Sequence, residues 1–144
     1  VHSPSATNVD VYIWTVSDTV SQELKEKVKS VLNEENIRPL TDKVNIKEPN
    51  KVNYSVDFDY YIEKDNETLV NVIKSNVDKT MQEYVNWQKE KIGKDINPDE
   101  LIKRLKIAGV KRVVLRNPVF QKLDFNQVAI NNRIVSNYQG VEEL

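Results

Sequence analysis

The sequence predicts an α+β fold of the ferredoxin-like, split βαβ type: an antiparallel sheet with helices on one face, an extra short helix and a C-terminal strand. Three observations support this prediction: an apolar, strand-like run at 9–16, a strict alternation over 52–62, and long helical patterns at 20–35 and 67–91. The elements follow in the order strand, helix, strand, strand, helix, helix, strand, strand. Right-handed crossovers would place both long helices on the same face of the sheet.

The first strand and the first helix are predicted from apolar runs and capping. Residues 9–16 are apolar on both faces, which is typical of a strand covered on two sides and central in its sheet. Thr19 and Gln22 form a capping-box pattern, and apolar residues then recur at helical spacing. Pro39 restricts the residue before it to extended geometry, so the helix ends before that point.

The clearest periodicity follows a short polar strand at 43–47 and a turn at 48–51 that contains a proline. From 52 to 62, apolar and polar residues alternate without a break, which predicts a strand with one buried face. The residues expected in the core are Val52, Tyr54, Val56, Phe58, Tyr60 and Ile62. The face open to solvent or to a partner would hold Asn53, Ser55, Asp57, Asp59 and Tyr61.

The remaining elements are predicted from helical spacing and from turn residues. A helix over 67–91 is followed by the sequence Asn97-Pro98-Asp99-Glu100, which combines an N-cap, a proline at the first helical position and an early acid. The short helix that begins there would stop at Gly109. A strand at 110–115 and a weaker strand within 127–138 complete the chain.

We expect residues 9–144 to form a single α+β domain. Residues 1–8 show no periodicity and are expected to be a flexible tail or linker from a missing N-terminal region. No apolar run approaches the roughly 20 residues of a membrane span, and the N-terminus lacks the apolar region of a signal peptide.

The composition narrows the classes of function. The chain has 21 basic and 22 acidic residues, so no general attraction to nucleic acid or to an anionic membrane is expected. It has no cysteine, which excludes disulfides, thiolate metal sites and cysteine nucleophiles.

Residues suited to catalysis are scarce. The single histidine, His2, lies in the predicted tail, and the three glycines are isolated, so no phosphate-binding loop is formed. Asp57 and Asp59 share a strand face and could hold a cation or a proton between them, but a solvated sheet face explains them as well. We therefore assign no catalytic, cofactor or metal residues and expect no enzymatic activity and no cofactor.

Several residues are candidates for protein contacts. Arg38 could pair with Asp42 to fix a turn, or it could contact another subunit. Trp87 shares a helix side with Tyr84 and belongs either to the core edge or to an interface patch. The possible interface residues are Arg38, Asp57, Asp59, Tyr61 and Trp87.

A local basic cluster has two interpretations. It consists of solvated faces partly neutralised by neighbouring acids, or it is a patch for an acidic protein or for RNA. Its members are Lys103, Arg104, Lys106, Lys111, Arg112 and Arg116.

Short motifs run through nearly the whole chain in a fixed order, and none of them is specific alone. They are Ser3-Pro4, Val9-Asp10-Val11-Tyr12-Ile13, Val31-Leu32-Asn33, Arg38-Pro39-Leu40-Thr41-Asp42 with Val44, the Tyr54 strand, Gly93-Lys94-Asp95-Ile96, Ala108-Gly109-Val110, and Val113-Val114-Leu115 with Pro118. In this order they resemble the C-terminal part of the baseplate J-like proteins of contractile phage tails and phage-tail-like particles.

The resemblance implies an architectural role. Baseplate J-like proteins are wedge subunits around the central hub of the baseplate, and their connected ring transmits the trigger for sheath contraction. The expected partners are other wedge subunits, further copies of the chain, and tail hub or sheath-proximal proteins. Neither a membrane nor nucleic acid is expected. The resemblance also implies assembly in the bacterial cytoplasm and a place in a phage virion, a prophage particle or a tailocin.

A second hypothesis is a module that binds RNA or single-stranded nucleic acid, because RNA-recognition domains share the split βαβ order. The aromatic residues at 54, 58 and 60 are predicted to face the core, where bases cannot stack on them.

Overall fold

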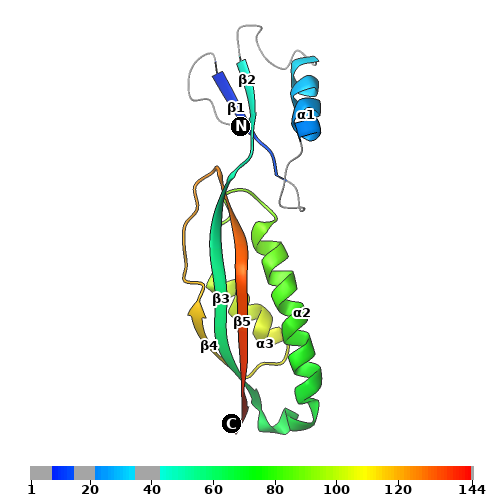
Figure 1. Ribbon diagram of the computed structural model, residues 1–144. Helices are drawn as coiled ribbons and strands as arrows, with labels where there is room; N and C mark the ends of the chain where they lie inside the picture. The colour runs from blue at the N-terminus through cyan, green and yellow to red at the C-terminus, as the bar shows by residue number, and fades with distance from the viewer. Residues whose placement is uncertain (1–7, 15–21, 35–42, 144) are drawn as a thin grey trace. The chain divides into compact units, whose positions relative to one another are not determined.

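The computed structural model describes residues 8–14, 22–34 and 43–143 (Figure 1). It is a mixed α/β structure whose contacts fall into two compact units. The N-terminal unit is Val1–Asn50 and the C-terminal unit is Lys51–Leu144. The sequence predicts one domain over 9–144, whereas the contacts separate residues before and after position 50.

The N-terminal unit is a small βαβ arrangement. Strand β1 (Asn8–Tyr12) and strand β2 (Lys43–Lys47) pair in parallel, and helix α1 (Gln22–Glu34) lies between them in the chain. A parallel pair needs such a long connection because the chain must return to the same end of the sheet. The residues that cap and end this helix in the sequence prediction, at 19 and 39, lie outside the described residues.

The predicted role of residues 9–16 as the centre of one antiparallel sheet is wrong. Within the described strands, β1 has β2 as its single neighbour and belongs to a separate two-stranded sheet. Its regular structure ends at Tyr12. Asp10 is buried in this strand, and its carboxylate accepts hydrogen bonds from Asn45 Nδ2 at 3.1 Å and Lys47 Nζ at 3.0 Å. The sequence predicts a strand covered on both faces, whereas among its described side chains Val11 is buried and Tyr12, Ile13 and Trp14 are half-buried. Apolar character also does not specify which strand is the partner.

The C-terminal unit is built on a three-stranded sheet with β3 in the middle. Strand β3 (Asn50–Glu63) lies between β4 (Arg112–Asn117) and β5 (Gln127–Glu142). Strand β4 is antiparallel to β3. Strand β5 runs in the same direction as β3, as Figure 1 shows. Side-chain contacts agree, because Asn131 reaches Tyr54, Asn137 reaches Asp59 and Lys64 reaches Glu143. The predicted all-antiparallel sheet is wrong on this point: the sheet is mixed.

Helices α2 (Val70–Lys89) and α3 (Pro98–Ile107) pack against one face of this sheet, whereas α1, which was predicted to lie on the same face, belongs to the N-terminal unit. A 3₁₀ helix (Lys64–Leu69) leads into α2, and α3 follows after a turn. The Asn97 side chain accepts a hydrogen bond from the backbone N–H of Asp99 at 3.0 Å, so the predicted N-cap is confirmed. Gly109 follows α3 with a φ of +113°, a conformation that favours glycine.

The core of this unit lies between the sheet and the two helices. The alternation predicted for β3 is confirmed: its even-numbered residues from Tyr54 to Ile62 are buried. They pack with Ile73, Val77, Met81 and Tyr84 of α2 and with Leu101 and Leu105 of α3. Three apolar positions of the helical patterns are instead exposed, because the apolar stripe of each helix is wider than its contact with the sheet. These are Leu69, Val72 and Ile107.

Candidate interaction surface

The sheet face opposite the helices carries polar side chains from all three strands. Along each strand these side chains alternate with residues whose side chains enter the core. We call this surface the open face. Its members are Asp57, Asp59, Tyr61, Arg112, Arg116 and Asn137.

Arg116 joins the two carboxylates of the open face. Its Nη1 and Nη2 donate to the two oxygens of Asp59, each at 2.9 Å, and Nη2 also lies 2.7 Å from Asp57 Oδ1. A planar guanidinium that meets a carboxylate through two bonds fixes orientation as well as charge. Asn137 Nδ2 donates to Asp59 at 3.1 Å, so this carboxylate connects all three strands.

A β-bulge places Arg116 between its partners. Asp57 lies opposite Asn117 and Phe58 lies opposite Leu115, so Arg116 is an extra residue in the register of β4. Bulges re-aim side chains in this way. The guanidinium can then reach two carboxylates that are two residues apart on β3.

The hydrogen bonds from Arg116 lower the pKa of Asp59 to about 2 and also lower the pKa of Asp57. They raise the pKa of the Arg116 guanidinium. Both carboxylates are therefore ionised at neutral pH, and neither keeps a proton for general acid catalysis. A cation bound between them would have to displace Arg116.

We predict that Arg116→Ala raises the pKa of Asp59 toward its ordinary value near 3.8, because the largest cause of the shift is then removed. Because the pKa of Asp59 is lowered in the folded chain, its ionised carboxylate adds to the free energy of unfolding above pH 4. This contribution is lost as the pH falls through about 2. Arg116→Ala should therefore lose less of its free energy of unfolding than the unaltered chain as the pH falls from 4 to about 2. Carboxyl carbon NMR titration measures the pKa, and unfolding at several pH values measures the stability.

Arg112→Ala is the matched control, because this arginine lies on the same strand and face but pairs with Glu142. It should leave the pKa of Asp59 low. An unchanged Asp59 pKa in Arg116→Ala would contradict the assignment.

Tyr61 forms the second contact group on this surface. The guanidinium carbon of Arg112 lies 4.0 Å from the centre of the Tyr61 ring. The Nε of Arg112 donates to both carboxylate oxygens of Glu142, at 3.2 and 3.0 Å. Stacking and ion pairing hold both side chains in place while leaving them partly exposed. Ordered amphipathic groups of this kind are common in protein interfaces.

Trp87 lies on α2, away from the open face, and packs against the core cluster. Its ring centre is 6.0 Å from that of Tyr84, 4.1 Å from Lys94 Nζ and 5.5 Å from the Arg104 guanidinium carbon. It is half-buried. The structure therefore places Trp87 at a core edge, apart from Asp57, Asp59 and Tyr61. Arg38 lies outside the described residues.

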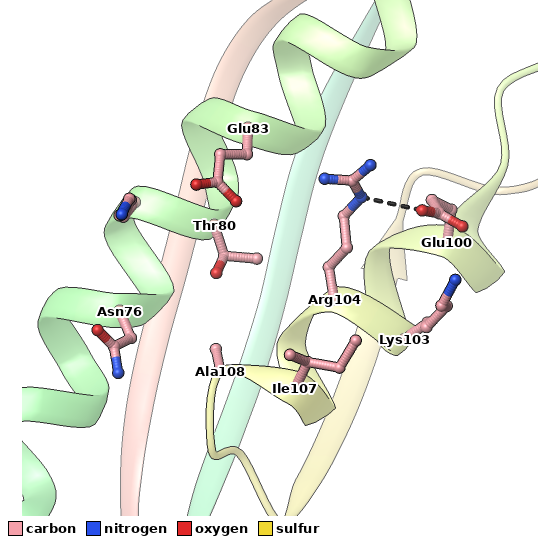
Figure 2. Close-up of a pocket in the computed structure, with 9 residues that line it drawn as sticks. Asn76, Thr80, Glu83, Glu100, Lys103, Arg104, Ile107 and Ala108 are labelled. Atoms are coloured by element: carbon pink, nitrogen blue, oxygen red, sulfur yellow. Dashed lines mark hydrogen bonds and ion pairs between the residues drawn. The ribbon is translucent and has the colours of Figure 1, made fainter.

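A groove of about 430 Å³ runs between α2 and α3 (Figure 2). Its charges are mixed: Glu83 and Lys79 come from α2, and Lys103, Glu100 and Arg104 come from α3. Arg104 Nε donates to Glu100 at 3.0 Å, as the dashed line in Figure 2 shows. The groove therefore presents little net charge to a ligand.

Several members of the predicted basic cluster have acidic partners. Arg104 pairs with Glu100, Lys111 and Arg112 pair with Glu142, and Arg116 pairs with both aspartates. The aromatic residues at 54, 58 and 60 are buried, as predicted, so they offer no stacking surface for bases.

Sequence reasoning missed the partners on the open face. Arg112 and Arg116 are identified in the sequence as members of a basic cluster, but the bulge that directs Arg116 has no signal in the sequence. Asn137 and Glu142 were missed because the last strand was predicted only weakly.

Neither a metal site nor a membrane-spanning helix is found in the described part of the chain. No group of three or more histidine or acidic residues there could hold a metal ion. No helix within those residues is long and apolar enough to cross a membrane.

Comparison with known proteins decides the family. The model of the baseplate J-like protein C-terminal domain matches residues 56–137, which is more than half of the chain and includes most of the three-stranded sheet and both of its helices. The chain belongs to this family. The baseplate J-like chain is also 26% identical over 117 residues to a protein described as baseplate protein J of Escherichia phage P2. The match covers 81% of the chain and 38% of the length of that relative.

Proposed function

We infer that this protein is a structural subunit of a contractile tail baseplate and takes part in its wedge. The observation that carries the inference is the family match over the C-terminal unit. The similarity to a phage baseplate protein over most of the chain supports it independently. In this role the chain assembles in the bacterial cytoplasm and becomes part of a phage virion or a phage-tail-like particle.

The open face supports a role in protein contact. Its side chains are held by ion pairs and hydrogen bonds before any partner binds, so little conformational entropy is lost on association. Its alternating charges favour a complementary polar surface over a purely apolar one. We propose that other wedge subunits, further copies of the chain, or tail hub or sheath-proximal proteins bind there, and that these contacts transmit the contraction trigger.

The same geometry favours a structural role over an enzymatic one. The paired carboxylates are occupied by a guanidinium, and the groove between α2 and α3 has its arginine tied to an acid on the same helix. The nucleic-acid hypothesis is disfavoured because the aromatic residues at 54, 58 and 60 are buried and the Tyr61 ring on the open face is already stacked by Arg112.

The test is incorporation into particles. The protein is supplied as the double variant Tyr61→Ser with Arg112→Glu, and particles are purified and analysed by mass spectrometry. The double variant should be depleted from particles because the ordered pair of the open face is lost. Lys103→Glu, an exposed change on α3, is the control and should be incorporated normally. Absence of the unaltered protein from particles would refute the proposed function, whereas normal incorporation of the double variant would refute only the role of the open face.

A further inference from the structure

A cleft lined by uncharged polar side chains lies at the end of the C-terminal sheet where β3 and β5 begin and β4 ends. Its volume is about 290 Å³, close to the lower limit of the roughly 300–1,000 Å³ that is typical of small-molecule sites. All three strands and the segment after β4 contribute to its walls. We call it the amide cleft, and its polar side chains are Asn53, Ser55, Asn117, Gln121 and Asn132.

The polar side chains of the amide cleft are available to a ligand. Within the described residues, none of the five forms a side-chain hydrogen bond with another part of the chain. The neighbouring Asn131 differs, because its Nδ2 donates to the backbone carbonyls of Tyr54 and Arg133. Each carboxamide of the cleft offers two N–H donors and one carbonyl acceptor, and the Ser55 hydroxyl can both donate and accept. The cleft therefore presents donors and acceptors together.

The backbone that carries these side chains is held in place. Gln121 and Ile96 exchange two backbone hydrogen bonds, at 2.9 and 3.2 Å. The backbone N–H of Leu123 donates to Asp95 Oδ1 at 2.7 Å, and the Leu123 side chain is buried. Asn117 lies in the sheet, where it pairs with β3. The walls of the cleft are therefore formed by the fold itself, so a ligand loses little affinity to ordering of the chain.

The composition and course of the cleft restrict what can bind. None of the described residues that line it is charged, so a charged ligand would lose its hydration without gaining an ion pair. The cleft crosses the strands, because Asn117 comes from β4 at one edge of the sheet and Asn132 from β5 at the other. An added peptide strand would instead run along a sheet edge. A compact, neutral ligand is therefore favoured over an extended peptide.

A neutral saccharide unit has the matching chemistry. Its hydroxyl groups both donate and accept hydrogen bonds, and the C–H groups of its ring pack against apolar side chains such as Val119, which lines the cleft. We propose that the amide cleft binds a neutral saccharide, whose hydroxyl groups pair with the carboxamides of Asn53, Asn117 and Asn132. This inference goes beyond the structural role proposed above and does not depend on it.

NMR titration of the purified, ¹⁵N-labelled chain tests the inference. Glucose, galactose, mannose and N-acetylglucosamine are each titrated into the millimolar range. At least one of them should shift the side-chain amide signals of the cleft and leave those of other asparagines unchanged. Glucuronate and glucosamine, which add a charge to the same ring, should bind about tenfold more weakly than glucose. The uncharged peptide Gly-Ser-Gly tests the competing class of ligand and should cause no shift.

Two substitutions locate the site. Asn117→Ala and Asn132→Ala should each weaken saccharide binding by about five- to tenfold, because each removes hydrogen bonds to the ligand. Asn71→Ala makes the same change at an exposed position on α2 and should leave binding unchanged. Circular dichroism verifies that the variants are folded. Absence of shifts with every neutral sugar, shifts with the peptide alone, or equal binding by both cleft variants would overturn the inference. None of these results bears on incorporation into particles, so the proposed function is tested separately.

Discussion

Phe58→Ala should lower the free energy of unfolding of the C-terminal unit by about 3–5 kcal/mol. The Phe58 side chain is fully buried in the central strand β3, where it belongs to the core cluster formed with both helices. Its ring centre lies 5.9 Å from that of Tyr60. Truncation removes the apolar surface that is buried on folding and leaves a cavity that the surrounding side chains cannot close completely.

Urea unfolding followed by tryptophan fluorescence measures this effect. The chain has two tryptophans, so a Trp14→Phe background leaves Trp87 as the reporter of the C-terminal unit. Phe120→Ala is the matched control, because Phe120 is 62% exposed on the loop after β4. The control should change the free energy of unfolding by less than about 0.5 kcal/mol. Equal effects of the two substitutions would show that the core has been placed wrongly.

The sequence was sufficient to predict the strand that contains Phe58. The alternation from 52 to 62 is a local property, and each residue takes its face from its position in the strand. Helix α3 was also predictable, because Asn97, Pro98 and Gly109 act within one or two turns of the helix ends.

The pairing of strands could not be predicted in the same way. The sequence of β1 indicates a buried strand but not whether it joins β2 in parallel or β3 in antiparallel order. The sequence of β5 is rich in asparagine and only weakly alternating, so its 16-residue length was underestimated. Its pairing with β3 stabilises it, and that contact joins residues far apart in the chain.

The candidate interaction surface could likewise be predicted only in part from the sequence. The shared face of Asp57, Asp59 and Tyr61 followed from alternation and is confirmed. The bond from Arg116 to both aspartates depends on the strand register and on one bulged residue of β4, neither of which has a local signature. Whether Arg38 and Trp87 contribute to an interface stays a prediction.

Gln88→Ala should destabilise the C-terminal unit by about 3 kcal/mol, although Gln88 is polar. Gln88 is fully buried on α2 and lies beneath the turn that leads to α3. Its Nε2 donates to the carbonyl of Asp95 at 2.7 Å, and its Oε1 accepts from the backbone N–H of Asn97 at 3.2 Å. The Tyr84 hydroxyl lies 3.2 Å from the same Oε1. Truncation leaves these backbone groups without their partner, and a buried unsatisfied group costs about 1–3 kcal/mol.

Two further variants distinguish the contribution of these hydrogen bonds to stability from the contribution of side-chain packing. Gln82→Ala makes the same change at an exposed position of the same helix and should have little effect. Gln88→Leu fills most of the volume without the polar atoms, so it should remain nearly as destabilising as alanine. Hydrogen exchange of the Asn97 amide provides a local measurement, because this N–H donates to Gln88. Faster exchange of the Asn97 amide in both Gln88 variants would show that the buried side-chain amide of Gln88 stabilises the turn before α3. Full stability in Gln88→Leu would instead mean that the side chain acts through its volume alone.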